Sequence, residues 1–560
     1  MTLRPRALNQ RSRPAAPTSC ANHLRSAWVA SSAPGNASVI NRTGIQVGLV
    51  PLLALEELVP NSLGIAFMLS CLLSCALLAP AVLPTFQDAE EAKPKGLLQR
   101  TEQAFDGYTL VAPLGSTETF LIDMDGEVVH VWGSELAPSG PVYLLENGNL
   151  MRPARHEAND RFNGGGIGGR LQEFSWDSEL LWDYPLVDDK QTQHHDVAQL
   201  PNGNWLAIVW KHNTPEEAIA AGRNPEVVLP KGLWSCSVLE VKPVRPSGGE
   251  IVWQWNSWDH LIQDFDKELA NYGSIPENSG RIDINGDFRD MPPITEAERK
   301  KLAELEKQMA ALGYAGGVEE DEGGEPSARF ERGKQSDWLH TNSVNYSAKH
   351  DLIVLSSPHM NEVWVLDHST SAAQAATGSG GHWKRGGDLL YRWGNPRNYG
   401  AGSNKDQALF YQHDPTWLET DEGTLKLLIY NNGRGRAEGD FSSVIELDLP
   451  FDPLTGFQRA AGKAFGPKEP AWSWGALGEL YSPFISGAQR LANGNTFICE
   501  GATGRLIEVT PGGEIVWEYV NNLDGMPAPK STIAPNAGAG ALFRGTRIAK
   551  GSPQLRNLED

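Results

Sequence analysis

A short pattern recurs along this 560-residue chain, and it limits the fold more than any other feature. In each copy, a turn with aspartate or glycine leads into an apolar strand that ends in an aromatic residue. Five clear copies lie at 125–132, 177–184, 249–255, 387–393 and 513–519, and a weaker sixth is divided between 444–448 and 472–474. Strands that recur in this way are typical of repeat architectures, in which each unit packs on its neighbours.

A second pattern marks tight turns. Asn-Gly-Asn triplets open strands at 147–149, 202–204 and 493–495, and Asn-Gly supplies the positive φ values that a hairpin turn requires. Six repeats of about four short antiparallel strands predict an all-β fold, a six-bladed β-propeller. A propeller of seven or eight blades is the alternative. We expect most of the 18 tryptophans to pack between blades.

The propeller is expected over residues 107–545, followed by a tail at 546–560, and it carries an insertion at about 259–335 that is partly helical. The insertion begins like a helix or an ordered loop. Further on, Thr295 and Glu298 form a capping box that predicts the start of an exposed helix. The polar and acidic stretch 316–327 predicts a disordered loop.

An N-terminal hydrophobic segment precedes the propeller. We expect a basic, disordered tail at 1–57, a signal or membrane-anchor segment at 58–87 and a linker at 88–106. Residues 63–83 are apolar and long enough to anchor the chain in a bilayer. Two interpretations stay open: an uncleaved anchor with its basic tail inside, or a true signal that begins near Met68. Both predict export to the periplasm or the cell envelope.

Composition excludes some partners. The formal net charge is −21, and a nucleic-acid-binding protein would need a basic face for the phosphates. Only Cys236 and Cys499 lie in the propeller, so we expect two buried free thiols, with a single disulfide as the alternative. No CxxC pattern indicates a zinc or haem site, and we predict no cofactor.

Three histidines precede or begin similar apolar strands in different repeats. His195 leads into 205–210, His340 into 352–355, and His413 into 425–430. The starts of the innermost strands of a propeller face the mouth of its central channel. If the three strands are equivalent, the three imidazoles meet there, and one of them could act as a nucleophile.

The histidine segments and the stretches 258–264, 282–285, 363–370 and 387–396 resemble the bacterial arylsulfotransferase family, over roughly 107–522. The resemblance implies a six-bladed propeller in which a histidine takes a sulfuryl group from an aryl sulfate and passes it to a phenol. By motif, His413 matches the nucleophile, His195 and His340 match two further active-site histidines, and Asn342 matches a polar partner. The second and third imidazoles would protonate the departing phenolate or hold the sulfuryl oxygens.

One departure from the family concerns the sulfate. The family places an arginine at the position that aligns with Pro358, and proline offers no side-chain donor. His359, Arg434 or Arg436 would have to supply the positive charge, although the two arginines also fit a solvated turn.

Three other functions compete with sulfuryl transfer. One is a non-catalytic propeller that binds a ligand or partner and has lost the sulfate-gripping arginine. Another is a quinoprotein dehydrogenase, for which we find no set of carboxylates to bind Ca²⁺. The third is a Zn²⁺ site made by the three imidazoles.

Overall fold

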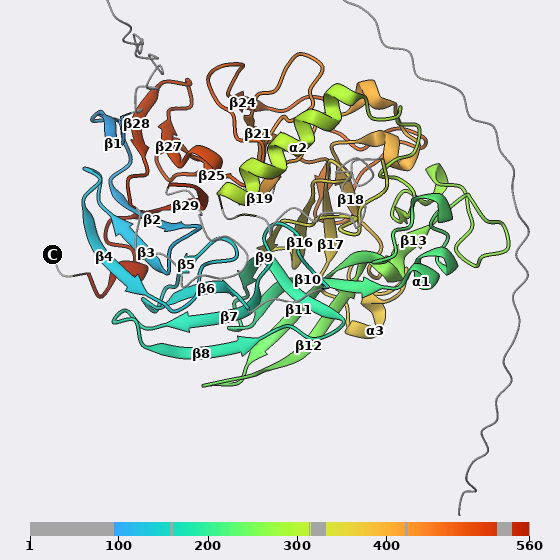
Figure 1. The fold of residues 1–560 in the computed structure, drawn as a ribbon, viewed down its shortest axis with the longest axis horizontal. Helices are drawn as coiled ribbons and strands as arrows, with labels where there is room; N and C mark the ends of the chain where they lie inside the picture. The colour runs from blue at the N-terminus through green and yellow to red at the C-terminus, as the bar shows by residue number, and fades with distance from the viewer. Residues whose placement is uncertain are drawn as a thin grey trace, which may run out of the picture. The chain divides into compact units, whose positions relative to one another are not determined.

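The computed structural model describes residues 94–156, 161–312, 314, 332–419, 424–523 and 540–558. The expected N-terminal tail, the apolar stretch 63–83 and the expected loop at 316–327 lie outside the described residues. No helix in the described part of the chain is long and apolar enough to cross a membrane. The described residues form six sheets around a central axis (Figure 1), so the prediction of a six-bladed β-propeller is confirmed.

Each blade is an antiparallel sheet whose first-named strand lies nearest the axis. Blade 1 consists of β29 (Leu542–Ala549), β2 (Gly107–Pro113), β3 (Glu118–Ile122) and β4 (Val128–Gly133). Blade 2 consists of β5 (Tyr143–Leu144), β6 (Leu150–Arg155), β7 (Gly169–Phe174) and β8 (Leu180–Pro185). Blade 3 consists of β9 (Gln191–Gln199), β10 (Trp205–Asn213), β11 (Leu233–Pro243) and β12 (Gly249–Asn256). Blade 4 consists of β15 (Ser343–Ser347), β16 (Leu352–Ser357), β17 (Glu362–Asp367) and β18 (Tyr391–Trp393). Blade 5 consists of β19 (His413–Glu419), β20 (Leu425–Asn431), β21 (Ser443–Asp448) and β24 (Trp472–Trp474). Blade 6 consists of β25 (Gly487–Arg490), β26 (Thr496–Glu500), β27 (Arg505–Val509), β28 (Ile515–Val520) and β1 (Gly96–Arg100).

Both ends of the propeller extend past the expected boundaries. β1 lies inside the expected linker 88–106, yet it pairs with β28 and adds a fifth strand to blade 6. β29 pairs with β2 over Gly107 to Pro113 and runs on to Ala549, into the expected tail. The last long strand of the chain therefore completes the first blade and closes the ring.

The Asn-Gly-Asn triplets are turns, as expected, and each joins the first two strands of a blade. Gly148, Gly203 and Gly494 have φ of +84°, +84° and +90°. The third residue of each triplet also reaches the third strand of its blade, because its side-chain amide donates to a glutamate there. The pairs are Asn149 with Glu173 at 2.8 Å, Asn204 with Glu240 at 2.5 Å and Asn495 with Glu508 at 2.7 Å.

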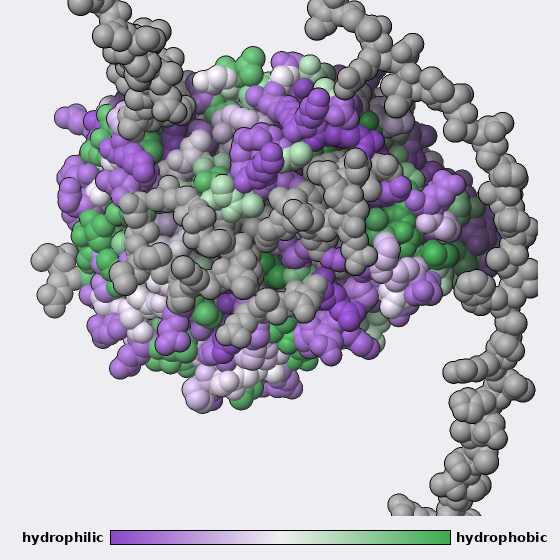
Figure 2. All heavy atoms as spheres, viewed as in Figure 1, coloured by the Kyte–Doolittle hydropathy of each residue, from purple (hydrophilic) through white to green (hydrophobic). Residues whose placement is uncertain are grey.

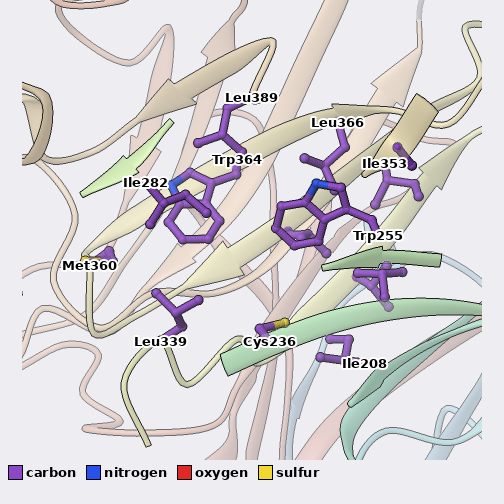
Figure 3. Packing of buried hydrophobic residues seen from close by; sticks show 14 of the residues in the cluster. Ile208, Cys236, Trp255, Ile282, Leu339, Ile353, Met360, Trp364, Leu366 and Leu389 are labelled. Atoms are coloured by element: carbon purple, nitrogen blue, oxygen red, sulfur yellow. The ribbon is translucent and has the colours of Figure 1, made fainter. Parts of the chain in front are cut away.

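Large aromatic side chains fill the spaces between blades, as predicted. Between blades 3 and 4, Trp255 and Trp364 lie in one cluster with Ile282 from the insertion (Figure 3). The free thiol of Cys236 lies in the same cluster, and that of Cys499 is buried in another, so the two do not form a disulfide.

The insertion after β12 is an ordered part of the structure where it is described. Its first half contains β13 (Leu261–Ile262), which pairs in parallel with β14 (Ile282–Asp283). A buried, bidentate ion pair between Arg223 and Asp287 ties it to blade 3, with N–O distances of 2.5 and 2.8 Å. The remaining short elements are α1 (Pro215–Ala220), α3 (Ala372–Ala375), the β22–β23 hairpin (Phe451–Asp452, Gly456–Phe457) and 3-10 turns at Pro225–Val227, Ser257–His260, Pro276–Asn278, Pro396–Tyr399, Asn404–Asp406, Gly501–Thr503 and Pro553–Leu555.

Helix α2 (Glu296–Ala311) begins with the expected capping box. The backbone N–H of Glu298 donates to the Thr295 hydroxyl, and the Glu298 carboxylate accepts from the Thr295 N–H at 2.7 Å. The helix lies across the near face of the ring, and its outward side is hydrophilic (Figures 1 and 2). The expectation of an exposed helix holds for that side only, because Leu305 is buried against Phe484 and Phe543.

The indole of Trp517 tests the packing between blades 6 and 1. Its side chain is fully buried, and its Nε1–H donates to the carbonyl of Met124 at 2.9 Å. Trp517→Ala should lower the free energy of unfolding by about 3–5 kcal/mol, because it leaves a cavity between two blades. Urea unfolding would measure this. Leu454→Ala, at a side chain that is 89% exposed, should change the free energy by less than about 0.5 kcal/mol.

Candidate active site

The structure brings the three predicted histidines together near the axis. His195 lies on β9, His340 lies just before β15, and His413 is the first residue of β19. The rings of His195 and His340 have centroids 4.6 Å apart. The ring of Phe543 on β29 lies 6.0 Å from that of His195 and 6.5 Å from that of His413. Four innermost strands or their approaches therefore contribute to one cluster.

Irregular backbone aims these side chains. His195, His340 and Asp414 have φ of +53°, +48° and +54°, in the left-handed region that non-glycine residues seldom occupy. β9 and β19 each carry a bulge at this end, around His195 and just after His413. Bulges and strained φ values are concentrated at functional sites, where they re-aim side chains.

Hydrogen bonds fix the tautomer of His413. Its Nδ1 lies 2.7 Å from Oδ1 of Asn432. The Nδ2 of Asn432 donates to the carbonyls of Ser482 and Ile485, both at 2.8 Å, so the amide oxygen must face the imidazole. Nδ1 of His413 is therefore the N–H donor, and Nε2 carries the lone pair. This Nε2 is buried and has no hydrogen-bond partner among the described residues.

His340 is paired with a buried carboxylate. Its Nδ1 hydrogen-bonds to Oδ2 of Asp337. Burial works to raise the pKa of Asp337, but His340 and its neighbours lower it below its usual value, so the carboxylate is ionised. The ring of His359 stacks on that of His340 with centroids 4.8 Å apart, and its Nδ1 donates to the Asp337 carbonyl at 2.8 Å.

A tyrosine from the insertion completes the cluster, and the sequence analysis missed it. The hydroxyl of Tyr314 lies 2.8 Å from Nε2 of His195 and 3.3 Å from Nε2 of His340. On the other side, Nδ1 of His195 lies 2.7 Å from Nδ1 of His194. A hydrogen-bonded chain thus runs from His194 through His195, Tyr314 and His340 to the carboxylate of Asp337.

Glycines allow this chain to pack closely. A Cβ on Gly166, which has φ of +73°, would lie 2.4 Å from the ring of His195, and one on Gly165 would lie 2.4 Å from the ring of Tyr314. The glycine-rich run 163–169 was the sequence signal for this contact, since glycine permits close approach of the backbone.

A cavity of about 380 Å³ opens beside the cluster. His340, His359 and His413 line it, together with Tyr314, Pro358 and apolar side chains of α2. His195 does not line it, because Tyr314 lies against its Nε2. Asn342 does not line it either; its Nδ2 donates to the carbonyl of Gln412 at 3.0 Å and so positions the segment that carries His413.

The imidazoles are mostly neutral. Burial lowers the pKa of His413 and of His194 to about 3, and that of His359 to about 4. Burial and the neighbouring imidazoles also lower the pKa of His195 well below its usual value. His359 is therefore uncharged at neutral pH and cannot replace the positive charge of an arginine. In the described part of the chain, no three His, Cys, Asp or Glu side chains are placed to hold a metal ion.

Two buried aspartates that follow His195 and His413 in the sequence form ion pairs with an arginine. Arg544 on β29 contacts Asp414 at 2.9 Å and Asp196 at 3.3 Å, and its guanidinium also donates to the hydroxyl of Tyr143 at 3.0 Å. Burial raises the pKa of Asp414 to about 6. Because both carboxylates hold Arg544, this guanidinium serves the structure rather than the cavity.

Comparison with known proteins agrees with this geometry. The family model for arylsulfotransferase (ASST) matches residues 112–446, more than half of the chain. The chain belongs to the arylsulfotransferase family. It is also similar to the arylsulfate sulfotransferase AssT of Lelliottia amnigena, with 27% identity over 204 residues, which cover 34% of this chain and 32% of that protein. The match thus spans about a third of this relative's length.

Two solved structures are similar to this chain at a low level. One is a protein of unknown function from Bacteroides caccae, with 11% identity, a TM-score of 0.37 and coverage of 79% of this chain and 99% of that one. The other is the periplasmic gluconolactonase PpgL of Pseudomonas aeruginosa, with 12% identity, a TM-score of 0.33 and the same coverages. Neither likeness bears on function.

Within the arylsulfotransferase family, the departure at Pro358 lies in the wall of the cavity itself. Arg434 also lines the cavity, and its guanidinium lies 3.4 Å from the centroid of the Tyr411 ring. Arg434 is partly buried, so it does not belong to a solvated turn. Arg436 is likewise partly buried, but it donates to Ser443 at 2.9 Å and does not line the cavity.

The lowered pKa of the buried histidines makes stability depend on pH. When the pH falls below about 6.5, the unfolded chain protonates these imidazoles while the folded chain does not, so stability falls with pH. For His194 this loss continues towards pH 3. His194→Phe should reduce the slope of unfolding free energy against pH by up to ~1.4 kcal/mol per pH unit between pH 6 and 4. Urea unfolding measures the slopes. Equal slopes in that range would contradict the assignment, and at pH 8 the two slopes should agree.

Proposed function

We propose that this arylsulfotransferase-family protein transfers a sulfuryl group from an aryl sulfate to a phenol through a covalent intermediate on Nε2 of His413. One observation carries the proposal: Asn432 accepts the Nδ1–H of His413, and Nε2 is left buried at a cavity wall with no hydrogen-bond partner among the described residues. A neutral imidazole with a fixed lone pair is a competent nucleophile. Its pKa of about 3 keeps it unprotonated across the neutral range.

In the first step, the lone pair on Nε2 of His413 attacks the sulfur. The N–S bond forms as the bond between sulfur and the aryl oxygen breaks, and the aryl oxygen leaves with the electron pair. The phenolate takes a proton from His340, whose protonated form the Asp337 carboxylate stabilises. Positive charge on the sulfated imidazole is held by the Nδ1–H bond to Asn432.

In the second step, a phenol replaces the first one in the same cavity. Its hydroxyl returns the proton to His340, and its oxygen attacks the sulfur as the N–S bond breaks. His413 regains its lone pair, so protons and charge balance over the cycle. Transfer in two steps replaces one difficult displacement by two easier ones.

The sulfuryl oxygens need a cation, and Arg434 is the candidate. It lines the cavity with His413, and its Nε is buried without a hydrogen-bond partner among the described residues. Burial works to raise the pKa of Tyr411, but the Arg434 guanidinium lowers it below its usual value. His359, being neutral with its Nδ1–H bonded to Asp337, offers a lone pair that suits a phenol O–H rather than a sulfuryl oxygen.

His413→Ala should abolish both transfer and adduct formation. The protein is incubated with p-nitrophenyl sulfate, release of p-nitrophenol is followed by absorbance, and the quenched protein is analysed by mass spectrometry. We expect one added SO₃ on the peptide that contains His413 in the parent protein and none in the variant. His382→Ala, at an exposed histidine, should retain both. Turnover by His413→Ala at the parent rate would rule out the proposed nucleophile.

Tyr314→Phe tests the hydrogen-bonded chain. The variant cannot bridge His195 and His340, so proton delivery to the leaving oxygen should weaken. We expect the rate with phenyl sulfate to fall about a hundredfold, because general acid catalysis contributes on this scale. The rate with p-nitrophenyl sulfate should fall less, since p-nitrophenolate departs without a proton. Tyr184→Phe, far from the cavity, serves as the control, and an equal fall with both substrates would argue for a structural role only.

A second function has one observation in its favour. Pro358 lines the cavity where the family carries an arginine, so the protein could bind phenolic ligands without transferring sulfate. Calorimetry with phenols, run beside the turnover assay, separates the two. Binding without turnover or adduct across a panel of aryl sulfates would favour the binding protein.

A further inference from the structure

We propose that helix α2 and the loops facing it form a second lobe of the substrate site, which binds the distal ring of an extended phenol such as a biphenylol or a fused-ring phenol. The proposal rests on the sulfuryl transfer proposed above. The outer lobe, as we name it, is a space of about 470 Å³ whose own wall includes Gln308, Gln407, Phe410 and Tyr481. Its volume alone falls in the range of about 300–1,000 Å³ that ligand sites occupy.

The outer lobe adjoins the cavity that His413 lines. The two spaces share the side chains of Leu302, Leu305, Tyr411 and Arg434. The histidines line only the inner cavity, whereas Phe410 and Gln308 line only the outer lobe. A substrate with its sulfated oxygen at His413 therefore has its far end in the outer lobe.

The wall of the outer lobe suits an uncharged, flat group. Its accessible surface is mostly apolar, and Ile294, Leu302 and Phe410 are among the side chains that supply it. Apart from Arg434, which is assigned above to the sulfuryl oxygens, the cations there are paired: Lys301 contacts Asp440, and Arg332 lies 3.7 Å from Glu298. An anionic tail would find no free cation among these pairs, while an aromatic ring would bury apolar area at no electrostatic cost.

A phenol with one ring would not need this space. The inner cavity, at about 380 Å³, already falls within the range for a small-ligand site. The added apolar contact of a second ring therefore increases affinity only for extended phenols. Because the sulfuryl group stays on His413 between the two steps, donor and acceptor occupy the same lobes in turn, and the preference applies to both.

Filling the outer lobe tests the proposal. Gln308 is exposed on α2 and lines only the outer lobe, so Gln308→Trp should occupy it without affecting the core. Its neighbour Lys307 lines neither space, and Lys307→Trp is the matched control. With p-nitrophenyl sulfate as donor, Gln308→Trp should lower kcat/KM for p-phenylphenol about tenfold or more and leave the value for phenol within about twofold. Lys307→Trp should change neither.

Binding measurements test the outer lobe independently of the proposed sulfuryl transfer. Calorimetry with p-phenylphenol and phenol needs no sulfuryl chemistry. If turnover is absent but Gln308→Trp selectively weakens binding of p-phenylphenol, the outer lobe is supported as a binding site and the proposed transferase activity is contradicted. If turnover is present and Gln308→Trp affects both acceptors equally or neither, the outer-lobe proposal is overturned and the proposed transferase activity is supported. Failure of the parent protein to prefer p-phenylphenol over phenol in binding would also overturn it.

Discussion

The pairing of β29 with β2 is the interaction on which the rest of the structure depends. An open arc of six blades would leave one face of each end blade unpacked, whereas a closed ring packs every blade between two neighbours and creates a central axis. Only in the closed ring do residues as distant in sequence as His195 and His413 face the same space. The closing strand also enters the site directly, because Phe543 on β29 lies beside both of these rings.

Crowding of imidazoles at the axis sets the chemistry. Rings this close cannot all be charged, since neighbouring positive charges repel and burial removes their hydration. The structure supplies one carboxylate at this level, Asp337, and pairs it with His340. The cluster therefore offers one carboxylate partner to a protonated imidazole. The sulfuryl transfer proposed above uses one proton, which the cluster would give up in the first step and recover in the second.

Much of the fold could be predicted because short sequence patterns for turns and strands recur along the chain. The Asn-Gly-Asn turns recur in three blades and the strands ending in an aromatic residue recur in at least five, so six blades and the convergence of three histidines followed from repeat phase. The strand β1 was missed because Gly96 to Arg100 lacks the alternation of a half-buried strand and pairs only at an edge.

The details of the site were harder to predict, because they depend on contacts distant in sequence. Tyr314 lies in an insertion with no repeat to align it, yet its hydroxyl bridges two histidines. The role of Asn432 depends on two backbone carbonyls fifty or more residues further on, at Ser482 and Ile485. Likewise, the turn that carries Arg434 looked solvated in sequence, and only the fold shows its guanidinium stacked on Tyr411.

Arg434 and the insertion border the same two spaces. Arg434 and Tyr411 form part of the wall between the inner cavity and the outer lobe, and α2 lines the other side of both. Pro358 lies in the turn after β16 and borders the inner cavity alone, whereas Arg434 lies in the loop after β20 and borders both spaces. A sulfate monoester carries a single negative charge, so one guanidinium is enough to pair it. Stacking on Tyr411 fixes that guanidinium in place. Under the two proposals above, an extended substrate would pass beside this pair from one lobe to the other.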